Sequence, residues 1–374
     1  MRKKEQFRSE RKQAKQRLHH LQPLRDLRDL RANAAALAVA ACFGAGGYKA
    51  ANANPTNPLI VNGAAQFTTT GNLLSITNTP NAIINWGSFS IGANEITRFV
   101  QQSASSAVLN RVTAQNPSSI LGALQSNGRV FLINPNGIVF GAGSQINVGG
   151  LVASTLNLSN EDFLAGRMRF TEGLGNSVIN QGNITTSPGG NVYLIGNAVT
   201  NNGIITSPKG DVILAAGKSV ELVNPGTPDL RVEIVAPDNQ ALNLGQIAAD
   251  SGRIGIYAGL INQSGSINAN SVSVDAAGQI TLKATKNTTL EAGSTTTASG
   301  PSGGKIEIQS GDTTLVAGTI EAKGVGVPPP PPGEGRGEGR GEGRGGSISI
   351  LGNLVGLTGN AAGQLHQNPV AERL

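Results

Sequence analysis

Histidine and cysteine side chains, which serve many enzymes as bases and nucleophiles, are scarce and scattered in this chain. The three histidines are His19, His20 and His366, and the one cysteine is Cys42. A catalytic triad or a metal site needs several such groups close together in the fold. Here these groups lie near the two ends of the chain, so their positions do not suggest such a site. The sequence therefore predicts no catalytic residue, no metal ligand and no bound cofactor.

Acidic side chains are the other candidates for chemistry, because polysaccharide lyases combine clustered acids with a Lys or Arg base. Asp211 lies close to Lys209, but each stands singly in a turn, where such residues are ordinary. Glu161 and Asp162 are better explained as acids in the first turn of a short helix, where negative charge interacts favourably with the helix dipole. We therefore predict that the chain is not an enzyme. A polysaccharide lyase-like or polysaccharide-binding protein is kept as the alternative.

The net charge of +6 is unevenly distributed along the chain. Residues 1–31 contain eleven Lys and Arg against four Asp and Glu, and Lys49 adds one further positive charge. These eight net positive charges exceed the total of +6, so the chain from Asn54 onward has a net charge of −2. Binding to nucleic-acid phosphates needs a basic surface, which is missing beyond the first segment, so we predict no nucleic-acid partner.

The first 53 residues have the features of an export signal. A basic stretch ends at Arg31, an alanine-rich apolar run covers residues 34–43, and the small residues Ala51 and Ala53 form a cleavage site. The apolar run is too short to span a bilayer. We predict an extended signal peptide over residues 1–53 that engages the Sec machinery and is removed by cleavage after Ala53. A soluble N-terminal helix is the plainer alternative.

Cys42 leaves a second interpretation of this segment open. Residues 39–42 also fit a lipobox, in which Cys42 would be lipidated and become the mature N-terminus. With cleavage after Ala53 instead, the mature chain has no cysteine and therefore no disulfide, although disulfides are common in exported proteins. The absence of a disulfide is compatible with a second membrane crossing in an unfolded state, because a disulfide would obstruct the passage of the unfolded chain.

The composition after residue 53 favours many short strands over helices. The chain has 51 glycines and only 3% aromatic residues, and its Val, Ile and Leu occur in short runs separated by Gly, Asn, Ser and Pro. Alternating apolar runs of this kind are typical of strands joined by tight turns. Only residues 160–170 look helical, with Asn160 as the candidate N-cap.

Internal repeats with a period near 20 residues indicate how these strands are arranged. The pattern Ser-Pro-x-Gly-x-Val-x-Leu begins at Ser187 and again at Ser207, and Gly-x-Ile begins at Gly245 and again at Gly265. One repeat suits one coil of a parallel β-helix, in which alternate residues point inward and stack on their equivalents about 4.8 Å away along the axis. We predict an all-β fold, a right-handed parallel β-helix. A β-sandwich is the rival fold, but it does not predict a repeat of fixed length.

Residues 325–345 interrupt the repeats. They contain five consecutive prolines and three Gly-Glu-Gly-Arg units, neither of which can contribute to a hydrophobic core. The Gly-x-Ile-x-Ile pattern at Gly304 resumes at Gly346, so we interpret the segment as a spacer loop inserted in one coil. We predict β-helix repeats over residues 176–324 and a residual coil with a C-terminal tail over residues 346–374.

A tight turn is predicted at Asn134-Pro135-Asn136-Gly137. Asn at the first position, Pro at the second and Gly at the fourth are the preferences of a type I turn. Apolar runs flank the turn, over residues 130–133 and 138–140. The residue types alone therefore predict a strand, a turn and a second strand.

Around this turn the sequence resembles the N-terminal secretion domain of filamentous haemagglutinins and haemolysins, the two-partner-secretion exoproteins of Gram-negative bacteria. The supporting segments are Asn85-Trp86-Gly87-Ser88-Phe89-Ser90-Ile91-Gly92, Phe99 through Val112, and Leu151-Val152-Ala153-Ser154-Thr155-Leu156. The likeness covers residues 55–175 closely, and the Gly- and Asn-rich repeats that follow also suit the family. The resemblance implies a secretion domain over residues 54–175 that caps the N-terminal end of the β-helix.

The resemblance also implies a partner, an outer-membrane β-barrel transporter with periplasmic docking domains. It would bind the secretion domain while the chain is extended, and the chain would fold outside the cell. Two roles stay open for Asn134–Gly137: a folding element of the β-helix, or a direct contact with the transporter. Some relatives carry a second turn, Asn-Pro-Asn-Leu, upstream; here the nearest match is Asn116-Pro117-Ser118-Ser119, which departs from it. We include Asn116 and Pro117 as further candidates for the secretion motif.

The activities found in the family set the functional expectation. Many members are adhesins, and others deliver toxins from a C-terminal domain. We therefore expect an exoprotein that passes through the periplasm of a Gram-negative bacterium to the outer cell surface or the medium. There it would act as a haemagglutinin-like adhesin on a host or cell-surface carbohydrate or protein. The alternative is the exported polysaccharide-binding or lyase-like β-helix protein described above.

Overall fold

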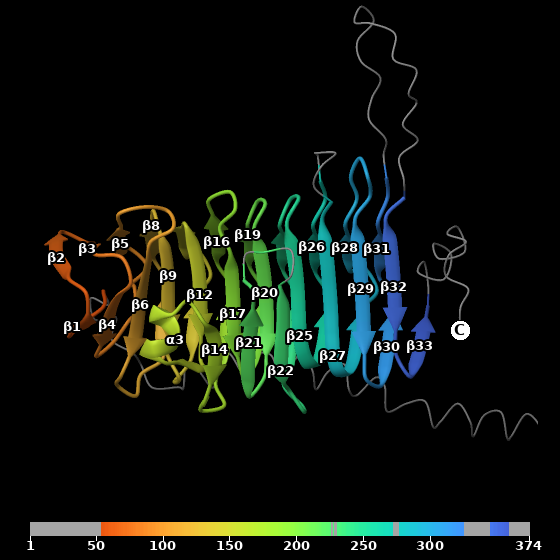
Figure 1. The fold of residues 1–374 in the computed structure, drawn as a ribbon, viewed down its shortest axis with the longest axis horizontal. Coiled ribbons are helices and arrows are strands. Elements are labelled where there is room, and N and C mark those ends of the chain that lie inside the picture. Colours follow the sequence, from red (N-terminus) through yellow and green to blue (C-terminus); the bar gives the residue numbers. More distant parts are fainter. Residues whose placement is uncertain (1–53, 226, 228–229, 272–276, 325–344, 359–374) are drawn as a thin grey trace, which may run out of the picture. The chain divides into compact units, whose positions relative to one another are not determined.

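The computed structural model describes residues 54–225, 227, 230–271, 277–324 and 345–358. Within them the chain forms a right-handed parallel β-helix, whose coils follow one another along one axis from β4 (Ala82–Trp86) to β33 (Leu354–Leu357) (Figure 1). The fold predicted from the repeats is therefore confirmed. No helix in these residues is long and apolar enough to cross a membrane.

Each coil contributes strands to three faces, which we call face 1, face 2 and face 3 in chain order. Face 1 contains β4, β6 (Ala107–Val112), β9 (Arg129–Ile133), β12 (Gly150–Ser154), β17 (Val192–Gly196), β20 (Asp211–Ala216), β29 (Lys305–Ser310) and β32 (Ser347–Leu351). Face 2 contains β7 (Ser118–Ile120), β10 (Ile138–Phe140), β15 (Ser177–Asn180), β18 (Ala198–Asn201), β23 (Gln240–Asn243), β30 (Thr313–Val316) and β33. Face 3 contains β5 (Ile96–Val100), β8 (Ala123–Ser126), β11 (Gln145–Val148), β16 (Asn183–Thr186), β19 (Ile204–Thr206), β24 (Gln246–Ala248), β26 (Ser266–Asn268), β28 (Thr295–Thr297) and β31 (Thr319–Glu321). The long strands β25 (Arg253–Gln263) and β27 (Gln279–Leu290) run from face 1 into face 2 and join these two faces into one sheet.

The sequence repeats occupy equivalent places in successive coils. Val192 pairs in register with Val212, and both side chains are fully buried. Ile306 pairs with Ile348, so the coils on either side of the inserted segment are neighbours along the axis. Stacked aliphatic side chains of this kind form one continuous core through the coils. Each fully buried Val, Leu or Ile contributes roughly 1.5–3 kcal/mol to folding.

A buried ladder of amides runs through the corner between face 2 and face 3. Asn180 donates through Nδ2 to Oδ1 of Asn201 across 2.8 Å, and Asn201 donates in the same way to Asn243 across 2.8 Å. Asn243 then donates to Oε1 of Gln263 across 2.7 Å. All four side chains are fully buried. The ladder links four successive coils, because each amide is hydrogen-bonded to its equivalent in the next coil.

An antiparallel cap closes the N-terminal end of the described coils. It consists of β1 (Leu59–Asn62), which pairs antiparallel with β4, and the hairpin of β2 (Ala65–Thr70) and β3 (Leu73–Asn78). Aromatic side chains fill the core beneath it, with ring centroids 5.6 Å apart for Trp86 and Phe89 and 6.4 Å apart for Phe89 and Phe99. The indole N–H of Trp86 donates to Oδ1 of Asn110 across 3.0 Å.

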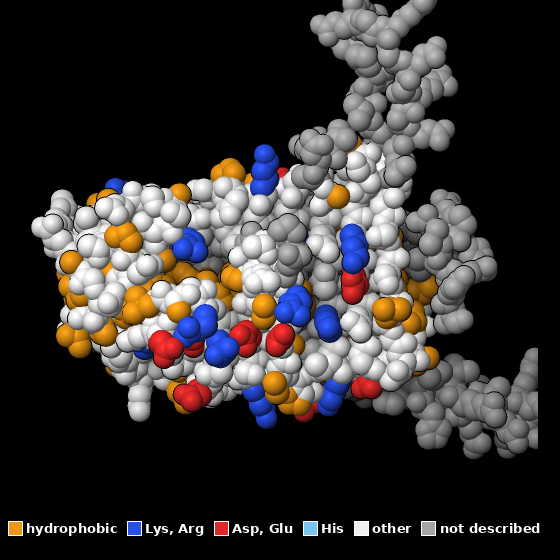
Figure 2. Space-filling view, in the orientation of Figure 1, with side chains coloured by type: hydrophobic (Ala, Val, Ile, Leu, Met, Phe, Trp, Pro, Cys, Tyr) orange, Lys and Arg blue, Asp and Glu red, His pale blue; other side chains and the backbone are white. Residues whose placement is uncertain are grey.

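A second, antiparallel sheet covers the outer side of face 1. It consists of β13 (Asn157–Leu158), β14 (Met168–Thr171), β21 (Ser219–Val223) and β22 (Arg231–Val235), and α3 (Asn160–Leu164) lies beside it. Phe131 and Ile133, which point outward from face 1, are buried in one cluster with Phe163 and Phe170. Burial on both sides explains the uninterrupted apolar runs of the face 1 strands. Figure 2 shows that Lys, Arg, Asp and Glu side chains gather over this covering sheet and α3.

The helix predicted over residues 160–170 is shorter than expected. Ser159, and not Asn160, is its N-cap, and the Ser159 hydroxyl accepts from the N–H of Asp162 across 3.0 Å. The helix ends before Gly166, whose φ of +72° favours glycine. Residues 168–170 of the predicted helix lie in strand β14, because pairing with β21, some fifty residues later in the chain, outweighs local helix propensity.

Arg111 ties this covering layer to face 1. Its guanidinium donates to Oδ1 of Asn160 across 2.7 Å and to the carbonyl of Leu158 across 2.6 Å. Burial lowers the pKa of Arg111 from its usual value, because the charged form is partly removed from water. Arg111, which belongs to the segment Phe99 through Val112 of the family resemblance, thus has structural partners in the covering layer.

Candidate functional site

The turn of the secretion motif lies at the corner between face 1 and face 2, where β9 ends and β10 begins. The N–H of Gly137 donates to the carbonyl of Asn134 across 3.1 Å, and the N–H of Asn136 donates to Oδ1 of Asn134 across 3.0 Å. Gly137 has a φ of +117°, a conformation that residues with a side chain rarely adopt. The structure therefore has a tight turn at the place where the residue types predict one.

Asn134 is fully buried, and both ends of its amide are used. Its Nδ2 donates to the carbonyl of Asn116 and to Oγ of Ser118, each across 2.9 Å. Both of these partners belong to the preceding coil, whereas Oδ1 accepts within the turn itself. In the folded chain Asn134 joins two coils and presents no surface to a partner.

Asn116 and Pro117 lie at the same corner one coil earlier, so the fold brings the six candidate residues of the secretion motif together. Asn136 extends the contact between the two coils, because its Nδ2 donates to the carbonyl of Ala114 across 2.9 Å. Asn116 and Pro117 are exposed, unlike Asn134. The corner therefore combines a buried part, which holds the coils together, with an exposed part.

Asparagines continue along this corner in the following coils, and the sequence analysis did not identify them. Asn176 donates through Nδ2 to the carbonyl of Pro135, and Asn239 donates to the carbonyl of Asn197, both across 2.8 Å. We call this set the corner column; it contains Asn116, Asn134, Asn136, Asn176, Asn197 and Asn239. The last three each stand one residue before a face 2 strand, and this position is the signal that sequence analysis could have used.

The acidic residues considered for catalysis are held in ion pairs. Arg167 contacts Glu161 across 2.7 Å and Asp162 across 2.6 Å. The hydrogen bond from Arg167 holds the pKa of Asp162 below its usual value. Asp211 is joined to Arg253 of the next coil by two hydrogen bonds of 2.8 Å. Across the described ranges no group of three or more His, Cys, Asp or Glu residues is arranged to hold a metal ion.

Some residues named in the sequence analysis lie outside the described residues. They are the cleavage-site residue Ala53, Cys42, the three histidines, and the proline and Gly-Glu-Gly-Arg units of the spacer. The signal peptide and the alternative lipidation of Cys42 therefore stay predictions.

Comparison with known proteins gives the family and the fold independently. Residues 51–326 match the family model described as the TPS secretion domain. The crystal structure of the HMW1 secretion domain from Haemophilus influenzae has a TM-score of 0.65 and 28% sequence identity with this chain. The match covers 82% of this chain and 100% of that domain.

Two similar sequences are heme/hemopexin-binding proteins of Haemophilus influenzae. One is 36% identical over 176 residues, which is 39% of this chain and 19% of the relative. The other is 40% identical over 90 residues, which is 24% of this chain and 10% of the relative. The matched part is thus less than a fifth of the length of either relative.

Proposed function

The chain belongs to the TPS secretion domain family, that of two-partner-secretion exoproteins, and from that premise we propose that an outer-membrane β-barrel transporter recognises it in an extended state. The chain then folds outside the cell. The observation that carries this proposal is the corner column, in which the buried amide of Asn134 finds its partners in the coil that precedes it. This amide is satisfied only when the preceding coil is in place, which is compatible with folding from the N-terminal end.

The strand pairing supports the same order of folding. Face 1 grows by parallel addition, with β6 on β4, β9 on β6 and β12 on β9. Each new coil needs mainly its predecessor, so a chain that emerges from a pore N-terminus first can fold as it appears. Folded coils do not fit back through the pore, and folding therefore favours outward movement.

We assign the buried part of the corner column to this folding step. Asn134 cannot touch a transporter once the chain is folded, since it is fully buried. Asn116 and Pro117 are exposed in the folded chain and are the members of the motif whose substitution tests a direct contact. A direct contact with the transporter in the extended state is the competing role for all six residues.

The route and the target complete the proposal. Residues 1–53 serve as a Sec signal peptide that is cleaved after Ala53, and the secretion domain over residues 54–175 caps the repeats that follow, over residues 176–324 and 346–374, with the spacer at 325–345 between them. The exoprotein reaches the outer surface or the medium of a Gram-negative bacterium and acts there as an adhesin, with a host or cell-surface molecule as its target. The names of the heme/hemopexin-binding relatives support a binding activity rather than an enzymatic one.

Export is tested by producing the full chain in a Gram-negative host with and without its cognate outer-membrane transporter. We expect the chain in the medium only when the transporter is present, and in the periplasm without it. Equal release in the two cases would contradict the proposal.

Two alanine variants separate the two roles of the corner in the same assay. Asn134→Ala should reach the medium but fold less stably, so limited proteolysis should degrade it faster than the wild type. Asn116→Ala should match the wild type in both release and protease resistance. Loss of release by Asn116→Ala with normal protease resistance would instead identify a transporter contact.

A further inference from the structure

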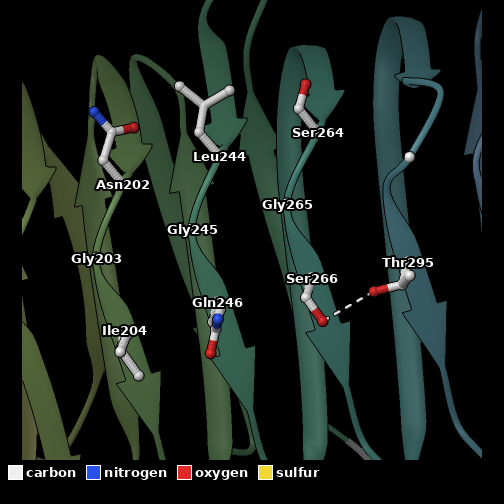
Figure 3. Close-up of a pocket in the computed structure, with 11 residues that line it drawn as sticks. Asn202, Gly203, Ile204, Leu244, Gly245, Gln246, Ser264, Gly265, Ser266 and Thr295 are labelled. Carbon is white, nitrogen blue, oxygen red and sulfur yellow. Dashed lines mark hydrogen bonds between the residues drawn. The ribbon is translucent and has the colours of Figure 1, made fainter.

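A shallow groove crosses the beginnings of strands β19, β24, β26 and β28 on face 3 and has a volume of about 410 Å³. Figure 3 shows its residues in three rows that run from coil to coil. Turn residues, among them Asn202 and Leu244, form one side, and the first residues of the strands, among them Gln246 and Ser266, form the other. Glycines lie between the two sides. The groove therefore runs along the axis of the β-helix, across the strands.

The glycine floor of the groove follows from the Gly-x-Ile repeat. A Cβ on Gly245 would lie 2.1 Å from the carbonyl oxygen of Gly203, and a Cβ on Gly265 would lie 2.0 Å from that of Gly245. Only glycine allows the backbones of neighbouring coils to approach so closely at this corner. Gly203, Gly245 and Gly265 meet this requirement in three successive coils, whereas the equivalent residue of the fourth coil is Ser294, and no side chain covers the backbone at these three glycines.

Face 3 has no charged side chain along the described strands from β8 to β28. Its outward positions there are mostly Asn, Gln, Ser and Thr, and the charged residues at either end are Arg98 on β5 and Glu321 on β31. This contrasts with the charged layer that covers face 1 (Figure 2). The outward side chains of these face 3 strands can thus form hydrogen bonds, but they carry no charge that would attract an ionic partner.

The groove has both polar and aliphatic groups available to a ligand. The side-chain amides of Asn202 and Gln246 are exposed and form no hydrogen bond with another described residue. Beside them, 42% of Ile204 and 44% of Leu244 is exposed. A sugar ring has the same combination, since its hydroxyl groups form hydrogen bonds at the edge while its C–H groups give it apolar faces.

We propose that this groove binds a neutral, extended polysaccharide that lies along the axis of the β-helix. Neighbouring coils are about 4.8 Å apart, and a β-1,4-linked pyranose chain advances by a similar distance per residue, so one sugar can face each coil. No aromatic side chain lines the groove, so binding per sugar should be weak and should increase with the number of coils engaged. The inference rests on the proposed role as a surface binding protein and names the chemical class of its target.

The test is affinity electrophoresis of the purified chain in native gels that contain a polysaccharide. Galactomannan and hydroxyethylcellulose supply neutral β-1,4-linked backbones, and pectate supplies an anionic one. We expect both neutral polymers to slow the chain and pectate to have no effect. The double variant Asn202→Ala/Gln246→Ala should bind the neutral polymers about tenfold more weakly, as expected for the loss of a few hydrogen bonds.

The matched control is Asn94→Ala/Gln240→Ala, which removes the same two residue types from exposed positions outside the groove. It should bind like the wild type. The proposal is overturned if no neutral polymer slows the wild type, if both double variants behave alike, or if pectate slows the chain more. A concentration-dependent dimer that only the groove variant loses would also overturn it, because a second copy would then occupy the groove. Since purified folded protein is used, these outcomes are independent of the export assay.

Discussion

Asn134→Ala removes a buried amide on which two coils depend. It deletes the donor to the Asn116 carbonyl and to Oγ of Ser118, together with the acceptor inside the turn. A buried polar group that loses its partner costs about 1–3 kcal/mol. The hydroxyl of Ser118 is fully buried and has no access to water. The bond to the Asn116 carbonyl and the bond from the N–H of Asn136 are only partly buried. We therefore expect the free energy of unfolding to fall by about 2–4 kcal/mol in total.

Trp86 provides the assay for this prediction. It is the only tryptophan of the chain, and it is buried in the cap of the secretion domain, two coils before the turn. Its fluorescence should report a lower urea midpoint for Asn134→Ala than for the wild type. Refolding from urea should also be slower, because the turn must dock on the preceding coil before the next one can stack. Comparison of the urea slopes shows whether the same amount of structure unfolds in each variant.

Two other asparagines of the corner column act as graded controls. Asn136→Ala loses a partly buried bond to the Ala114 carbonyl and should cost about 1 kcal/mol. Asn116→Ala loses an exposed contact of 3.4 Å to the Gly87 carbonyl and should change the stability by less than about 0.5 kcal/mol. A wild-type midpoint for Asn134→Ala, or a larger effect of Asn116→Ala, would refute this account of the corner.

Three further predictions concern the coils. Asn201→Leu interrupts the buried ladder and removes the partner of Nδ2 of Asn180 and of Oδ1 of Asn243, so the free energy of unfolding should fall by about 2–4 kcal/mol; an unchanged urea midpoint would show that the ladder adds nothing. Gly245→Ala places a Cβ against the Gly203 backbone and should lower Tm by about 5 °C or more, whereas Gly345→Ala, with open space around it, should melt like the wild type; equal Tm values would contradict the close packing of the glycine corner. Burial raises the pKa of Tyr193, so its contribution to stability is complete below about pH 10, the unfolded value, and is lost as the pH rises further. Tyr193→Phe should therefore reduce the loss of stability between about pH 9 and pH 11, and an equally steep loss would exclude this tyrosine as its cause.

The β-helix could be predicted because its information is local and periodic. Ser187 and Ser207 lie in the equivalent turns before β17 and β20 of neighbouring coils, and Gly245 and Gly265 stand at equivalent corners. A repeat of inward-pointing aliphatic residues has to be buried, and stacking equivalent coils buries it. The tight turn at Asn134–Gly137 was predictable for the same reason, since the turn depends on the conformational preferences of its own four residues.

Contacts between distant segments could not be predicted in this way. The helix expected over residues 160–170 ends early because Arg169 and its neighbours pair with β21, where Arg169 reaches Glu221 across 3.0 Å. Nothing within the eleven residues indicates that strand partner. The covering sheet over face 1 was missed for the same reason, although the uninterrupted apolar run over residues 130–133 is compatible with burial on both sides.

For the motif residues, too, some properties follow from the sequence and others only from the tertiary structure. Their types determined the turn, and their order in the chain determined the resemblance to a secretion domain. Only the tertiary structure decided that Asn134 is buried and Asn116 exposed, because burial depends on which coil lies against the turn. It likewise decided that uncharged side chains spread over seven strands form one face with a groove. The sequence places these residues about one coil apart, but only the stacking of the coils along the axis brings them side by side.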